Sequence, residues 1–105
     1  MGTLYIINVR VVKRKTLVDF YSTYKETKSQ LEAWYYEAKN SNWNNPLEIK
    51  EKYGTASIIE GDKVVFNIKG NKYRLVTKIN YQMKTAYIKF IGTHKEYDKI
   101  NVEEL

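Results

Sequence analysis

The spacing of hydrophobic residues changes once along the chain, and this change separates a predicted helical part from a predicted sheet. Before Gly54, apolar side chains recur every three or four positions, which is typical of amphipathic helices. The first such stripe consists of Leu17, Phe20, Tyr21 and Tyr24, and the second of Leu31, Trp34, Tyr35 and Ala38. After Gly54, apolar and polar residues alternate, which is the period of strands with one buried face. A β-branched run at residues 4–12 predicts a further strand before the first helix.

Local signals predict where the helices begin. The first helix is expected over residues 16–24. Ser29 and Glu32 have the spacing of a capping box, in which each side chain satisfies an unpaired backbone N–H at the start of the second helix. Asn45 followed by Pro46 supplies a cap and a first-turn proline, which together predict a short third helix.

The second part of the chain predicts a meander of strands and a last helix. The expected strands cover residues 63–69, 72–81 and 85–91. Gly70-Asn71 offers a tight turn between the first two strands. Thr93 and Glu96 have a second capping-box spacing, which predicts a C-terminal helix that ends near Ile100.

The order of these elements predicts an α+β fold. An N-terminal strand and two or three helices would pack on one face of a mainly antiparallel sheet, with a short helix at the C-terminus. At 105 residues and 12.5 kDa, the chain fits a single domain over residues 1–105.

Composition excludes several kinds of site. Cysteine is absent, which excludes disulfides, thiolate catalysis and metal sites built on sulfur. With one histidine and no phosphate-binding glycine pattern, we expect neither a metal nor a cofactor. No segment resembles a signal peptide, and no apolar run approaches the roughly 20 residues that cross a bilayer. We therefore expect a cytoplasmic protein without a membrane partner.

Charge then suggests the kind of partner. Eighteen Lys and Arg against 12 Asp and Glu give a net charge of +6, which favours a polyanion. The segment from Lys63 to Lys95 contains eight Lys and Arg and no acidic residue. With the predicted alternation, one outward sheet face would present a row of cations suited to RNA. These cations are Lys69, Lys72, Arg74 and Lys78. The same pattern also fits a solvated sheet face without a partner.

Reactive side chains are densest between Gly92 and Asp98. His94 is the only histidine, and an imidazole transfers protons near neutral pH. Asp98 lies one helical turn later and could orient the ring, while Tyr97 offers a flat ring for stacking. RNA cleavage by attack of a 2′-hydroxyl needs proton transfer and also cations at the phosphate. The candidate cations are Lys69, Lys72 and Arg74. A lone histidine at a helix start is, however, more often a cap or a surface residue than a catalytic group.

Two segments carry a resemblance to a known family. Residues 65–76 and 87–98 closely resemble the HigB toxins of bacterial type II toxin–antitoxin modules, which belong to the RelE/ParE superfamily. The helical segments 31–35 and 43–46 are also similar to that family. The resemblance covers roughly residues 10–102, so residues 1–9 precede the usual start of the family.

The resemblance implies a RelE-like fold and a specific activity. HigB toxins are mRNA interferases that cleave mRNA on the ribosome without a metal. They are held inactive by HigA, an antitoxin with a helix-turn-helix domain, and they reach DNA only through that antitoxin. Arg74 matches the strand arginine of the superfamily, and Lys69 and Lys72 fall near its strand lysines. His94 stands where RelE itself has an arginine.

The sequence therefore predicts roles for twelve side chains. Arg74 would stabilise the phosphate with help from Lys69 and Lys72, and His94 would act as general acid or base. Tyr97 and Asp98 would position that ring or the substrate. The expected RNA contacts, mostly with 16S ribosomal RNA, are Lys13, Arg14, Lys15, Lys78, Lys84 and Lys95. Two alternatives stay open: an RNA- or ribosome-binding module without catalysis, and a gyrase-directed toxin of the ParE type, because a shared fold does not fix the activity.

Overall fold

The computed structural model describes residues 8–105, and these residues build helices against one sheet. The strands are β1 (Arg10–Val12), β2 (Ser57–Ile59), β3 (Lys63–Ile68), β4 (Tyr73–Asn80) and β5 (Thr85–Thr93). The helices are α1 (Arg14–Thr23), α2 (Lys28–Lys39), α3 (Pro46–Lys52) and α4 (His94–Tyr97), with 3₁₀ turns at η1 (Lys25–Thr27) and η2 (Val102–Glu104). The sheet has the order β1-β5-β4-β3-β2, in which only the β1–β5 pair is parallel. The predicted α+β fold with a mainly antiparallel sheet is confirmed.

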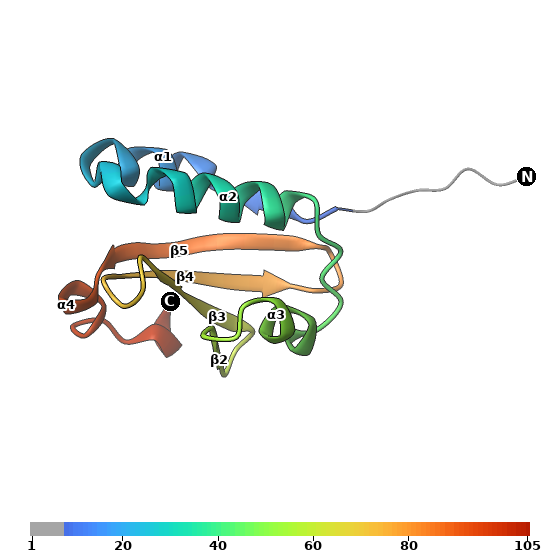
Figure 1. Ribbon diagram of the computed structural model, residues 1–105. Coiled ribbons are helices and arrows are strands. Elements are labelled where there is room, and N and C mark those ends of the chain that lie inside the picture. The colour runs from blue at the N-terminus through green and yellow to red at the C-terminus, as the bar shows by residue number, and fades with distance from the viewer. Residues whose placement is uncertain (1–7) are drawn as a thin grey trace, which may run out of the picture.

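Helices α1 and α2 lie together over one face of the sheet, as Figure 1 shows. Trp34 of α2 packs edge-on against Phe66 of β3, with ring centroids 5.4 Å apart. Leu31 of α2 and Leu75 of β4 are completely buried in the same core. Alternate residues of β3 and β4 thus face the helices, as expected for strands with one buried face.

The first strand is shorter than the sequence predicts. Of the expected strand over residues 4–12, only Arg10–Val12 pairs with β5, and residues 4–7 lie outside the described part of the chain. The backbone N–H of Val9 donates to the carbonyl oxygen of Ser41, after the end of α2, at 3.1 Å. Because this bond goes to a loop, the ladder with β5 begins only at Arg10.

The predicted capping box at Ser29 and Glu32 is wrong. Helix α2 begins at Lys28 and continues directly from η1, and no side chain caps Thr27, the residue before it. The N–H groups of Thr27 and Lys28 instead bond to carbonyl oxygens of the preceding turn. Ser29 therefore lies inside the helix, where a cap is not needed. By contrast, the predicted cap at Asn45 is confirmed, since its side chain accepts from the N–H of Glu48 at 3.1 Å.

The C-terminal helix is confirmed in position but is shorter than predicted. Thr93 and Glu96 form the predicted capping box, with bonds of 2.8 and 3.2 Å, and α4 ends at Tyr97. The chain then reaches the sheet face opposite the helices, where the ammonium group of Lys63 donates to the carbonyl oxygen of Glu103 at 2.6 Å. Figure 1 shows this C-terminal turn on the side of the sheet away from α1 and α2. That face is therefore partly covered, and the fully outward face expected from the sequence is not observed.

Candidate active site

The turn between β3 and β4 is joined to α4 by the backbone. The N–H of His94 donates to the carbonyl oxygen of Lys72 at 2.9 Å. In the adjoining ladder, Tyr73 pairs with Thr93 and Arg74 pairs with Gly92. These pairings bring the start of β4 beside α4, so residues about 20 positions apart in the sequence form one site.

His94 is held by an aspartate and is open to solvent. Its Nδ1 lies 2.9 Å from Oδ2 of Asp98, and 47% of its side chain is exposed. A carboxylate at this distance accepts the Nδ1 proton, which leaves Nε2 with the lone pair in the neutral ring. The pair can therefore present a proton-accepting nitrogen to a ligand outside the protein.

Arg74 is oriented by Asn71 and not by an acid. Its two terminal nitrogens donate to the backbone oxygen of Asn71 at 2.9 Å and to its side-chain oxygen at 3.0 Å. Within residues 8–105, no carboxylate forms a salt bridge with Arg74. Its charge is thus not neutralised by the described chain, and a guanidinium suits a phosphate because it donates two parallel hydrogen bonds.

Tyr97 connects this guanidinium with the helix that carries His94. The guanidinium carbon of Arg74 lies over the Tyr97 ring, 5.7 Å from its centroid. The ring of Phe90 also packs near Tyr97, with its centroid 6.5 Å from that of Tyr97. Since Tyr97 is three residues after His94 on one helical turn, the two side chains are neighbours on α4. One short helix therefore carries the imidazole and the ring beneath the guanidinium.

The structure corrects the expected location of Lys69 and Lys72. Both lie in the turn between β3 and β4, so the alternation of a strand does not apply to them. The N–H of Lys69 donates to the side chain of Gln30 in α2, and the ammonium of Lys72 lies 3.4 Å from Glu26 in η1. Lys72 thus extends toward the helical layer and does not share the face of Arg74. Of the four cations predicted to share one sheet face, only Arg74 and Lys78 lie on the same face of β4.

Glu26 also binds the first residue of β4. The Tyr73 hydroxyl donates to Oε1 of Glu26, and this bond together with the nearby Lys72 ammonium lowers the pKa of Glu26. The same bond, reinforced by burial, raises the pKa of Tyr73 to about 12. The result is a charged contact that fixes the start of β4 to η1. Sequence reasoning missed Glu26 because nothing in its local pattern indicates a partner 47 residues away.

The cations expected to bind ribosomal RNA are spread over several elements. Arg14 lies over the Tyr35 ring at 4.5 Å, Lys15 pairs with Asp19 at 2.7 Å, and both are at the start of α1 beside Lys13. The Lys84 ammonium donates to the Trp43 carbonyl at 2.8 Å and to Asn44 at 2.6 Å, so it joins two loops. Lys78 and Lys95 are exposed, on β4 and α4.

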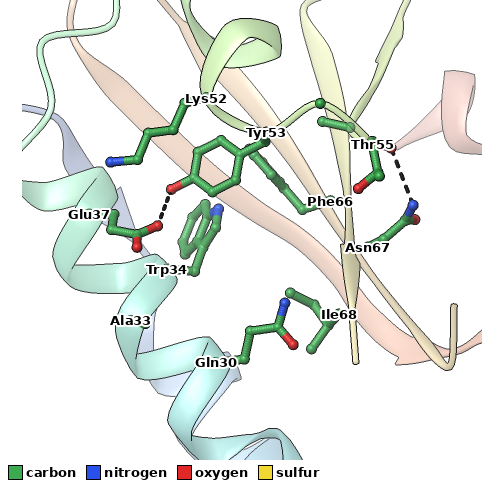
Figure 2. A pocket seen from close by; sticks show the side chains of 12 residues that line it. Gln30, Ala33, Trp34, Glu37, Lys52, Tyr53, Thr55, Phe66, Asn67 and Ile68 are labelled. Atoms are coloured by element: carbon green, nitrogen blue, oxygen red, sulfur yellow. Dashed lines mark hydrogen bonds between the residues drawn. The ribbon is translucent and has the colours of Figure 1, made fainter. Parts of the chain in front are cut away.

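A separate pocket lies on the helical side of the sheet. It has a volume of about 370 Å³ between α2, β3 and the segment after α3, and Trp34, Tyr53 and Phe66 form much of its lining (Figure 2). The indole nitrogen of Trp34 is buried and has no hydrogen-bond partner within residues 8–105. The Tyr53 hydroxyl donates to Glu37 at 2.5 Å across the pocket rim. None of the predicted catalytic side chains lines this pocket.

The described residues, 8–105, contain neither a candidate metal-binding group nor a candidate membrane-spanning helix. No group of three or more His, Asp or Glu side chains in this range is arranged to hold a metal ion. No helix in the described range is long and apolar enough to cross a membrane.

Comparisons with known proteins identify relatives of this fold and site. The sequence model of the HigB toxins, described as the RelE-like toxic component of a toxin–antitoxin system, matches residues 27–100. The chain is 28% identical over 92 residues to the mRNA interferase toxin HigB of Escherichia coli K12, with 86% of this chain and 88% of the relative covered. The mRNA interferase HigB of Shigella flexneri matches to the same extent. Because the family match includes the strands and α4 that build the site, the chain belongs to the HigB toxin family, the RelE-like toxic components of toxin–antitoxin systems.

Proposed function

We propose that this toxin is an endoribonuclease that cleaves mRNA during translation. The observation that carries the proposal is the arrangement on α4, where the His94–Asp98 pair is next to the ring that supports Arg74. Cleavage at a phosphodiester requires a proton-transfer group and a cation at the phosphate, and within residues 8–105 the Arg74 guanidinium has no carboxylate partner. The names of the relatives, which describe mRNA interferases, support the same conclusion.

In the proposed reaction, the 2′-hydroxyl of the substrate attacks the adjacent phosphorus. The new bond joins the 2′-oxygen to phosphorus while the bond from phosphorus to the 5′-oxygen of the next nucleotide breaks. The 2′-hydroxyl loses a proton and the departing oxygen gains one, which gives a 2′,3′-cyclic phosphate and a 5′-hydroxyl. Nε2 of His94 would perform one of these proton transfers, and Asp98 would hold the ring in the required orientation.

Arg74 would act on the charge of the phosphate. Negative charge grows on the non-bridging oxygens as the 2′-oxygen attacks, and a preorganised cation lowers the energy of that state. Asn71 and Tyr97 would serve as positioning residues, because they hold the guanidinium before substrate arrives. Lys69 and Lys72 would raise the local positive potential from the neighbouring turn.

The partners follow from the family and from the charge. A toxin of a toxin–antitoxin system has an antitoxin, and we propose a HigA-like protein with a helix-turn-helix domain. The net charge of +6 supports binding of RNA, mostly ribosomal RNA, by Lys13, Arg14, Lys15, Lys78, Lys84 and Lys95. The proposed place of action is the cytoplasm, and the proposed unit of function is one domain over residues 1–105.

A purified translation system tests the proposal. The protein is added to ribosomes translating a defined mRNA, and new 5′ ends are mapped by primer extension, with an arm that contains mRNA but no ribosomes. We expect cut ends only with ribosomes, and about 10²-fold fewer of them, or fewer still, with His94→Ala. Ribosome stalling without cut ends would instead indicate a binding module. Unchanged translation together with inhibited DNA supercoiling by gyrase would indicate a ParE-like toxin.

A further inference from the structure

The sheet face that carries Arg74 continues along β4 and β5 away from α4. On β4, Arg74, Val76 and Lys78 are alternate residues and therefore face the same side. Their partners on β5 are Gly92, Phe90 and Tyr87, respectively, and directly paired side chains lie on the same face. Val76 is completely buried between these two cations, so the exposed part of the face runs along β5, where Phe90 is half-buried and Tyr87 is exposed.

A bulge in β5 adds another cation beside this row. Val76 pairs with Phe90 while Thr77 pairs with Ile88, so Lys89 is an extra residue without a partner on β4. A bulge redirects side chains and is frequent near functional sites. Lys89 and Lys78 both line an open hollow of about 640 Å³ together with Tyr87. Neither lysine forms a salt bridge within residues 8–105.

The hollow combines a stacking ring with positive charge. Tyr87 is a large aromatic residue near the start of β5, and 39% of it is exposed. Tyr81 also lines the hollow, and its buried hydroxyl has no hydrogen-bond partner in the described chain. Asp62 contributes one negative charge to the lining, against two ammonium groups. Single-stranded RNA binds to surfaces of this kind by stacking bases on aromatic rings and placing phosphates near cations.

We infer that the mRNA strand bound at Arg74 continues past Phe90 along β5 to a second nucleotide subsite. In this subsite a base stacks on Tyr87, while Lys78 and Lys89 contact the flanking phosphate. This inference rests on the proposed function, because it states along which strand the mRNA substrate extends from the cleavage site. Arg74 and Lys78 are four residues apart on one strand, or about 13 Å at the usual rise. The subsite would therefore hold a nucleotide a few positions from the cut and add binding energy without touching the scissile bond.

Binding of RNA to the His94→Ala protein tests this subsite separately from cleavage. The probe is a fluorescein-labelled single-stranded RNA octanucleotide. A set of otherwise identical probes is also measured, in each of which one nucleotide lacks its base. For the His94→Ala protein we expect one position, away from the cut, at which loss of the base weakens binding about tenfold. With Tyr87→Ala added, the intact probe should bind about tenfold more weakly, and that position should become insensitive to loss of its base.

Matched variants separate stacking from charge. Tyr87→Phe keeps the ring and should bind like its parent, whereas Lys89→Gln should reduce the slope of log affinity against log salt by about 0.7. Lys39→Gln on α2, outside this face, should bind like its parent with an unchanged slope. An identical base-removal profile with and without Tyr87 would overturn the subsite. That result would leave the proposed cleavage untouched, since cut ends are measured on the protein with His94 intact.

Discussion

The backbone N–H of His94 donates to the carbonyl oxygen of Lys72 at 2.9 Å, which fixes the first residue of α4 to the turn that precedes β4. The same turn contains Asn71, whose two oxygens hold Arg74. Both functional groups of the proposed reaction are therefore positioned by one turn of four residues, 69–72. This arrangement suits a small toxin, because the site depends on short-range backbone bonds and not on a deep cleft.

Asn71 provides a direct test of this positioning. Asn71→Ala removes the side-chain acceptor of Arg74 but leaves the backbone acceptor, so the guanidinium keeps its charge and loses part of its orientation. We expect kcat for mRNA cleavage to fall by about tenfold, the equivalent of one hydrogen bond to a charged group. Asn71→Asp, which restores an acceptor but adds a competing negative charge, should be at least as impaired. Wild-type rates for both variants would show that Asn71 does not position Arg74.

Asp98 is expected to act through His94. Asp98→Asn keeps the size of the side chain but removes the charged acceptor 2.9 Å from Nδ1. We expect a fall in kcat with little change in KM, since the aspartate would touch the imidazole and not the RNA. Asp19→Asn, which alters another exposed i,i+4 pair on α1, is the matched control and should cleave normally. Equal rates for the Asp98 variant and its parent would remove Asp98 from the site.

Gly92 is required for the packing beneath Tyr97. A Cβ at this position would lie 2.5 Å from the Phe90 ring, which could not stay in place against Tyr97. Gly92→Ala is expected to destabilise the protein by about 1–3 kcal/mol, as overpacking does elsewhere, and to reduce cleavage. Gly54→Ala serves as the control, because a Cβ there meets no atom within 4 Å. Urea unfolding of the two variants measures the difference, and equal stabilities would contradict the packing described.

The contact between Glu26 and Tyr73 predicts a dependence of stability on pH. The pKa of Glu26 is lowered in the folded protein from an ordinary value of 4.5, so the unfolded state takes up the proton first as pH falls. The stabilisation is therefore complete above about pH 4.5 and is lost as pH falls through the folded pKa. Relative to Glu26→Gln, the wild type should have a higher melting temperature at pH 6.5, and this advantage should shrink toward pH 3.5. A constant difference across that range would show that Glu26 does not contribute in this way.

The sequence predicted those features that depend on local spacing. The apolar stripes of α1 and α2, the cap at Asn45 and the capping box at Thr93 are all set by residues within one or two turns. The last of these is important for the site, because it starts α4 at His94. The order of the elements predicted the α+β fold, and the resemblance to HigB toxins, confirmed by the family match, added the RelE-like type and the expected activity.

Features that depend on distant contacts were not predictable in this way. Lys72 follows the parity of β4 in the sequence, but β4 begins only at Tyr73, and Glu26 attracts the lysine toward η1. The bulge at Lys89 depends on the register between β4 and β5, which alternation alone does not specify. The short β1 likewise reflects a bond from Val9 to the loop after α2.

The most direct test of the account is the rate of mRNA cleavage on translating ribosomes by His94→Ala, Arg74→Ala and the protein with both changes. Neither His94, whose side chain is 47% exposed, nor Arg74 belongs to the hydrophobic core, so thermal unfolding should show a folded protein in each case. We expect each single variant to lose about 10²-fold or more, and the double variant to lose little beyond the worse single one, because both groups act on one phosphate in one transition state. Wild-type rates for either single variant, or losses that simply multiply, would contradict a shared site built from α4 and the start of β4.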